Sequence, residues 1–166
     1  MNKINIEIRK KEIYTDTVPT LMPYAHIHRE IEAVYVKSGS AKCYADNLVY
    51  EICEGDIFVC FPEQVHYYSD VKPGEYCLMI FSPDVIYGQK SVLLGNIPKN
   101  NVYADSCGKL SHIIDSFCET GGDFDETMNA GLINLLMAHI LNESELVEIK
   151  NKTIPFLEKE DEIKKG

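Results

Sequence analysis

HIHREIEAVYVKSGS, residues 26–40, places two imidazoles and two carboxylates at alternating positions ahead of an apolar run. In a β-strand, residues two apart share a face, so His26, His28, Glu30 and Glu32 are expected to point the same way. If that face looks into a barrel, a buried carboxylate on it needs a cation or several hydrogen-bond donors. Two histidines and one carboxylate are a common ligand set for Fe(II), Mn(II) or Zn(II). A metal site, a pocket for a polar small molecule and a plain strand edge are all compatible with this stretch.

A second polar cluster follows in EGDIFVCFPEQVHYYSD, residues 54–70. Gly55 and Asp56 supply a turn into an apolar strand, and Pro62 ends that strand. His66 begins the next strand, where it can return to face the first cluster, and Tyr68 shares its side. The combined spacing of the two clusters is more specific than a lone HxH pair.

The rest of the pattern predicts a mainly β chain. Ile4, Ile6 and Ile8 alternate with polar residues, which is typical of a half-buried first strand. Short strand-like runs separated by turn signals favour an antiparallel sandwich or barrel, and they lie at 31–37, 41–45, 48–52, 56–61, 66–69 and 75–81. Residues 80–105 form a loop-rich crossing. Two apolar helical patterns follow, so we expect a barrel at 1–105, a helical pair at 106–145 and a linker or tail at 146–166.

Composition limits the function. The net charge is −10 over 166 residues, with a pI near 4.9, and such a surface repels DNA. The six cysteines form no CxxC pair, the N-terminus is charged, and no apolar stretch is long enough to span a membrane. These features indicate a cytoplasmic protein with reduced thiols and no membrane partner.

Two motifs in the sequence resemble those of a known family. His26-x-His28-x3-Glu32-x6-Gly39 is similar to the first cupin motif, and Gly55, Pro62 and His66 are similar to the second. The shortened PEQVH ending, the EIEAVYVKSGS phrase and the trailing helices resemble the N-terminal half of AraC-type transcription regulators. The resemblance covers residues 5 to 145.

This resemblance implies a cupin-like antiparallel β-barrel (jelly roll) followed by two C-terminal α-helices. It implies a domain that binds a small effector, often a sugar, and forms a homodimer through the helices. In that family a C-terminal pair of helix-turn-helix units binds DNA. This sequence has no room for them, so we expect a sensor fragment of a DNA-binding regulator of transcription, with DNA as a partner only through the missing half.

The candidate site follows from the motif positions. The expected ligand-binding residues are His26, His28, Glu32, His66, Tyr24 and Tyr68, with Tyr35 as a further aromatic surface. The first four of these are candidate ligands for a divalent metal, with Zn, Ni, Mn and Fe as the candidates. No catalytic residue is expected, and the chain is predicted not to be an enzyme. The alternative is a stand-alone cupin metalloenzyme in which the same four residues hold the metal.

Overall fold

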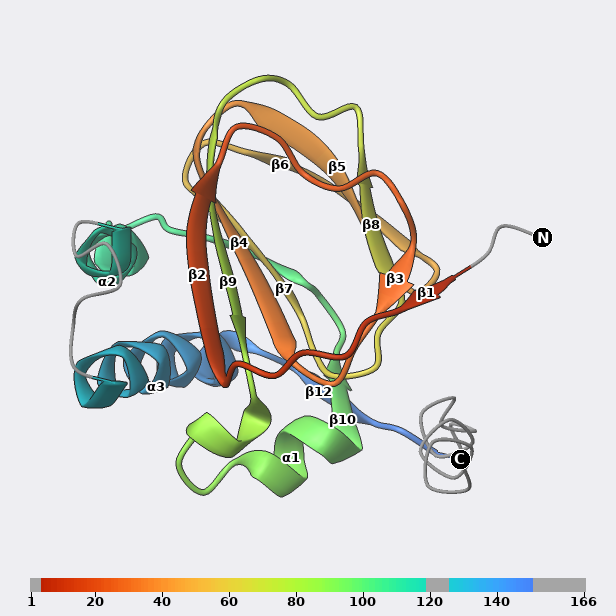
Figure 1. Cartoon of the computed structure of the whole chain (residues 1–166), viewed down its shortest axis with the longest axis vertical. Coiled ribbons are helices and arrows are strands. Elements are labelled where there is room, and N and C mark those ends of the chain that lie inside the picture. The colour runs from red at the N-terminus through yellow and green to blue at the C-terminus, as the bar shows by residue number, and fades with distance from the viewer. Residues whose placement is uncertain (1–3, 119–125, 151–166) are drawn as a thin grey trace.

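Two five-stranded sheets form the body of the protein in the computed structural model, which describes residues 4–118 and 126–150. One sheet contains, in order, β1 (Asn5–Ile6), β3 (His26–Ile27), β8 (His66–Ser69), β5 (Ser40–Ala45) and β6 (Leu48–Cys53). The other contains β11 (Val102–Ala104), β7 (Asp56–Cys60), β4 (Ile31–Ser38), β9 (Glu75–Phe81) and β2 (Ile13–Val18). The sheets face each other as a cupin-like barrel (Figure 1), and the described pairs are antiparallel except β1 with β3.

Alternation along β4 divides the core into two parts. Val34 and Val36 face the barrel interior, where they pack with residues such as Phe58 and Tyr68. Ile31, Ala33 and Tyr35 are equally buried but face outward, into a second apolar cluster beneath the helices. A strand that is covered on both faces reads as a nearly continuous apolar run, and this one does.

Two helices cover the outer face of the sheet that contains β4 (Figure 1). α2 (Lys109–Cys118) begins where Asp105 accepts hydrogen bonds from the backbone N–H groups of Leu110 and Ser111. α3 (Glu126–Glu143) buries Ile133, Leu136, Met137 and Ile140 in the same outer cluster. Among the helices described, none has the length and apolar character to cross a membrane. The predicted fold class, a mainly β barrel followed by two helices, is confirmed.

The crossing at residues 80–105 contains more regular structure than its sequence predicted. It includes the short 3-10 helix η1 (Pro83–Val85), the helix α1 (Lys90–Gly95), the strand β10 (Asn96–Pro98) and β11. β10 pairs with β12 (Leu146–Glu148), so the first residues of the predicted tail lie beside this crossing, while residues 151–166 lie outside the described part. The division of the chain at residues 105 and 145 stays a prediction.

The N-terminal strands differ from expectation. β1 has only two residues, and Ile4 and Ile8 are 47% and 69% exposed, because β1 pairs in parallel with an equally short β3. The half-buried strand predicted from these isoleucines was therefore wrong in length. β2 was not predicted at all, since it is an edge strand that pairs with β9 alone and carries polar residues such as Asp16 and Thr17.

Candidate functional site

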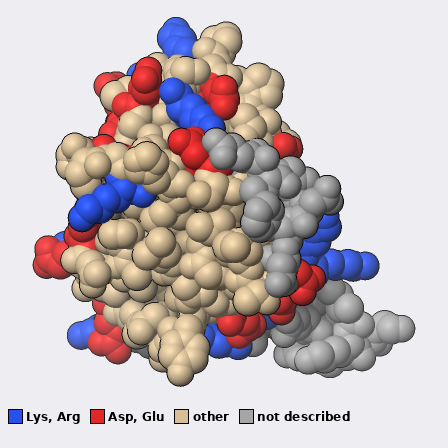
Figure 2. All heavy atoms as spheres, turned by 90° about the vertical axis from the view of Figure 1, so that its left-hand side faces the viewer, with Lys and Arg blue, Asp and Glu red and all other residues tan. Residues whose placement is uncertain are grey.

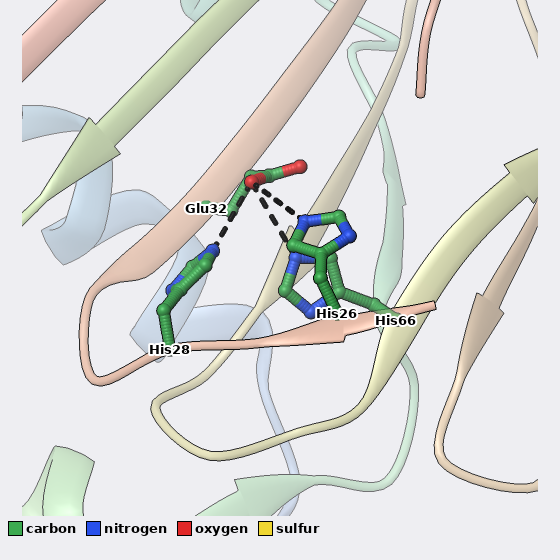
Figure 3. A group of neighbouring side chains, drawn as sticks. All are labelled: His26, His28, Glu32 and His66. Carbon is green, nitrogen blue, oxygen red and sulfur yellow. Dashed lines mark hydrogen bonds and ion pairs between the residues drawn. The ribbon is translucent and has the colours of Figure 1, made fainter. Parts of the chain in front are cut away.

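Four buried polar side chains meet inside the barrel (Figure 3). His26 lies on β3, His28 on the segment that leads into β4, Glu32 on β4 and His66 at the start of β8. Each residue is at most 3% exposed, and one ligand-type atom from each lies within 4.8 Å of the others. The structure thus brings together the four residues that the alternation and spacing had singled out.

The geometry that joins them is not one continuous strand. β3 and β4 belong to opposite sheets, and residues 28–30 cross between them. His26 lies directly opposite His66 in the pairing of β3 with β8. Glu30 was predicted to share the face of the cluster, and this was wrong because it lies on the crossing segment. Its carboxylate Oε2 lies 3.5 Å from His28 Nδ1, on the side away from Glu32.

The three imidazoles are oriented alike, each with its Nδ1 on a backbone carbonyl. The acceptors are Tyr24 O for His26 at 3.1 Å, Glu30 O for His28 at 3.1 Å and Gln64 O for His66 at 2.9 Å. A carbonyl oxygen can only accept, so each Nδ1 carries a hydrogen and the Nε2 of a neutral ring keeps its lone pair. The Nε2 atoms lie 3.7, 3.2 and 3.4 Å from Glu32 Oε2, for His26, His28 and His66 respectively.

Glu32 is ionised in this environment. Burial alone would raise its pKa, but the surrounding imidazoles, His66 above all, hold the pKa of the carboxyl well below its usual range. Burial lowers the pKa of His26, but Glu32, the carbonyl of Tyr24 and the charge of Glu7 together raise it by more, so the net shift is upward. Tyr68 donates a hydrogen bond of 2.6 Å to Glu32 Oε1, and burial together with this carboxylate raises the pKa of the phenol well above its ordinary value.

The four side chains fit a divalent metal ion. The Nε2 of His66 is buried and has no hydrogen-bond partner within the described part of the chain. A proton on one imidazole balances Glu32 but leaves the other Nε2 lone pairs facing the carboxylate, and a cation relieves that repulsion. Ligand atoms around a tetrahedral zinc lie about 3.3 Å apart for bonds of about 2.0 Å. The Nε2–Oε2 distances of 3.2 to 3.7 Å are close to this value.

A cavity of about 230 Å³ opens above this cluster. Its floor includes His26, Glu32 and Tyr68, and Tyr24 lies at its rim with its ring 5.7 Å from that of His26. Tyr35 packs in the outer cluster beneath the helices instead, so its predicted role as a ligand surface was wrong. A larger hollow of about 470 Å³ lies elsewhere, beside Arg29, Glu30, Asp84 and Lys90 among others. It contains none of the four clustered residues, so the smaller cavity is the candidate site.

Other residues of the site carried no signal in the sequence. Gln64 supplies the carbonyl that orients His66, and its own side chain bonds Asp46, the backbone N–H of Phe61 and Asn101. Its position two residues before His66 is the one feature of the sequence that could have pointed to Gln64. Arg9 and Glu7 also line the cavity, from the segment between β1 and β2.

Comparison with known proteins relates the sequence and the fold to one family. Residues 20–89 match the sequence model of the AraC-like ligand binding domain. The resemblance to the AraC-type sensor domain is confirmed. The AraC-like transcriptional activator CuxR has a similar fold, with a TM-score of 0.60 and 13% identity over 86% of this chain and 55% of CuxR.

A second solved structure, ToxT from Vibrio cholerae, is 11% identical over 86% of this chain and 61% of ToxT, with a TM-score of 0.53. This chain therefore spans little more than half the length of these two AraC-like proteins. At such identities the likeness concerns the fold. No curated protein matches this chain.

Proposed function

We propose that this chain is the effector-sensing and dimerisation half of an AraC-type transcription regulator. The observation that carries the proposal is the barrel cavity, which leads from an opening near Tyr24 down to the buried cluster around Glu32. A concave, largely apolar site with a few converging polar groups is the usual form of a small-molecule site. The family match, residues 20–89, includes Tyr24 and the four clustered residues.

A bound effector would act by favouring one of two arrangements of the domain. The cavity is lined by β2, β9, β4, β8 and β3, so a ligand in it contacts both sheets of the barrel. β2 also contacts α2, which gives the sheets a direct path to the helical layer. We propose that DNA is contacted by a separate helix-turn-helix half of the regulator, in the cytoplasm, because the net charge of −10 opposes DNA binding by these residues.

The exposed face of α3 supports a homodimer. Met128 and Leu135 are each 49% exposed and lie seven residues apart, on one side of the helix, together with exposed Gly131 and Ala138. This stripe has no charged residue. Figure 2 shows the side of the molecule that carries the helices, with charged side chains around the margin and an uncharged centre. A helix that is apolar on both faces needs a second partner to bury its outer face.

Thermal shift measurements test the sensor function. Sugars, polyols and small organic acids are added to the purified chain with and without Zn, Ni, Mn or Fe, and one class should raise Tm by several degrees. Val18→Trp, which places a large ring in the cavity, should abolish the shift, whereas Leu48→Trp on the exposed β5–β6 hairpin should not. If the Tm shift is retained in Val18→Trp, the ligand binds outside the barrel cavity.

A metalloenzyme is the second candidate, because three imidazoles and a carboxylate converge below the cavity. The cluster residues would hold the metal, which supplies a Lewis acid and a position for substrate. Elemental analysis of protein expressed in metal-supplemented medium, together with the thermal shift measurements, distinguishes a sensor from a metalloenzyme. About one metal per chain with turnover of a bound compound would favour the enzyme, and a ligand-induced shift without turnover would favour the sensor.

A further inference from the structure

We propose that the ligand of the barrel cavity is a small carboxylic acid with an apolar body, and that Arg9 receives its carboxylate. The inference rests on the proposed sensor function and names the chemical class of its effector. It follows from three properties of the cavity: the cation in its lining, the apolar side chains of that lining and the volume enclosed.

Arg9 contributes a positive charge to the cavity lining, and one of its N–H groups has no acceptor among the described residues. Its Nη2 donates to Glu7 Oε2 at 2.7 Å, and its guanidinium carbon lies 5.9 Å from the ring centre of Tyr14. The Nε of Arg9 is buried, and no acceptor for it exists among the described residues. A buried donor without an acceptor is unfavourable, more so on a charged group. Because 29% of the side chain is exposed, it can turn to offer this N–H to a ligand without disturbing the core.

The partner best suited to Arg9 is a carboxylate. A hydrogen bond from a guanidinium to an ionised oxygen is roughly twice as strong as one between neutral groups. Glu7 accepts a hydrogen bond from Nη2, so the Nε–H is the donor left for a ligand.

Much of the cavity lining is apolar and offers few hydrogen-bond partners to a sugar. This apolar part consists of side chains from three segments: Val18, Leu21, Met22, Leu78 and Ile80. A ring of hydroxyls against these residues would lose its hydrogen bonds to water without replacement. An alkyl or small aromatic body gains free energy from the same contact.

The volume sets the size of the ligand. At about 30 Å³ for each water-sized group, the 230 Å³ of the cavity holds about eight non-hydrogen atoms. Hexanoate has about this number of non-hydrogen atoms. Hexanoate is therefore the probe that the cavity fits.

Calorimetric titration of the purified chain tests the inference with three probes: hexanoate, hexan-1-ol and glucose. Hexanoate should bind at least about 10-fold more tightly than hexan-1-ol. Arg9→Gln should remove this difference and Arg9→Lys should restore part of it. Lys10→Gln, which removes a charge from the exposed neighbouring residue, should leave it unchanged.

Three results would overturn the inference: equal binding of the acid and the alcohol, unchanged hexanoate binding by Arg9→Gln, or no binding of hexanoate at all. Binding of glucose at the cavity without hexanoate would leave the sensor function standing and reject the acid as its ligand class. If the wider thermal shift panel also gave no ligand, the sensor function itself would fail.

Discussion

Glu32 is the residue on which the site depends most, because it contacts all three imidazoles and Tyr68. Glu32→Gln removes the one carboxylate of the candidate metal site. We expect the affinity for Zn²⁺ to fall by more than roughly 100-fold, since loss of even an outer partner of a metal ligand costs 10- to 100-fold. Competition with a chromophoric chelator measures the change. Glu51→Gln, on the exposed part of β6, is the matched control, and equal affinities in both variants would place the ion elsewhere.

Tyr68 supplies the short hydrogen bond to the other oxygen of the same carboxylate. Tyr68→Phe keeps the ring and leaves a buried, ionised oxygen with one donor fewer, which should lower the free energy of unfolding by about 1–3 kcal/mol. Urea denaturation of the metal-free protein measures the loss. Tyr67→Phe, on the outer side of the same strand where its ring stacks on Tyr44, should cost less than about 0.5 kcal/mol. Equal losses would contradict a special role for the phenol of Tyr68.

The sequence located the clustered residues better than their surroundings. His26, His28, Glu32 and His66 were found because alternation along a strand and motif spacing are local properties. Arg9 and Asn101 were not found, since their positions depend on how distant segments return to the barrel. No local pattern carries that information.

At the scale of elements, strands bounded by clear turn signals were predicted closely, whereas the edge strand β2 and the crossing segments were not. β8 and β9 begin and end at the predicted residues, because both have clear turn signals at their ends. β2 was missed because an edge strand tolerates polar residues on its open side. The crossing at residues 28–30 was missed because HIHREIE keeps its alternation through the change of sheet.

The turn between β4 and β5 depends on Gly39. Its φ is +96°, and a Cβ built there would lie 2.6 Å from the Tyr76 hydroxyl oxygen, which is fixed by hydrogen bonds to Ser40 O and Lys72 O. Gly55 has a φ of +88° but no atom within 4 Å of such a Cβ. Alanine at either position adds about 1–2 kcal/mol of backbone strain, and only Gly39→Ala adds a steric clash.

We therefore expect Gly39→Ala to reduce the free energy of unfolding by at least about 1 kcal/mol more than Gly55→Ala does. Urea denaturation of the two variants, followed by circular dichroism, measures the difference. Equal losses would show that the hydroxyl of Tyr76 moves aside without cost.

At the scale of the whole molecule, the uncharged stripe on α3 predicts self-association. Leu135→Glu places a charge in the middle of the stripe, and we expect the proposed dimer to dissociate into monomers. Sedimentation velocity measures the mass of the species in solution. Leu48→Glu adds the same charge at a residue of similar exposure on the β5–β6 hairpin and should leave the dimer intact. A dimer that persists in Leu135→Glu would have its interface elsewhere.

The first sheet is joined between β3 and β8 through one directly opposed pair, His26 and His66. Both side chains belong to the candidate metal site, so an ion bound by the two imidazoles would cross-link this narrow seam. Metal binding could then be detected by hydrogen exchange, without a spectroscopic signal from the metal itself. Amide hydrogen exchange at Ile27 and Tyr67 should slow when the ion binds, because local opening of the seam would require its release.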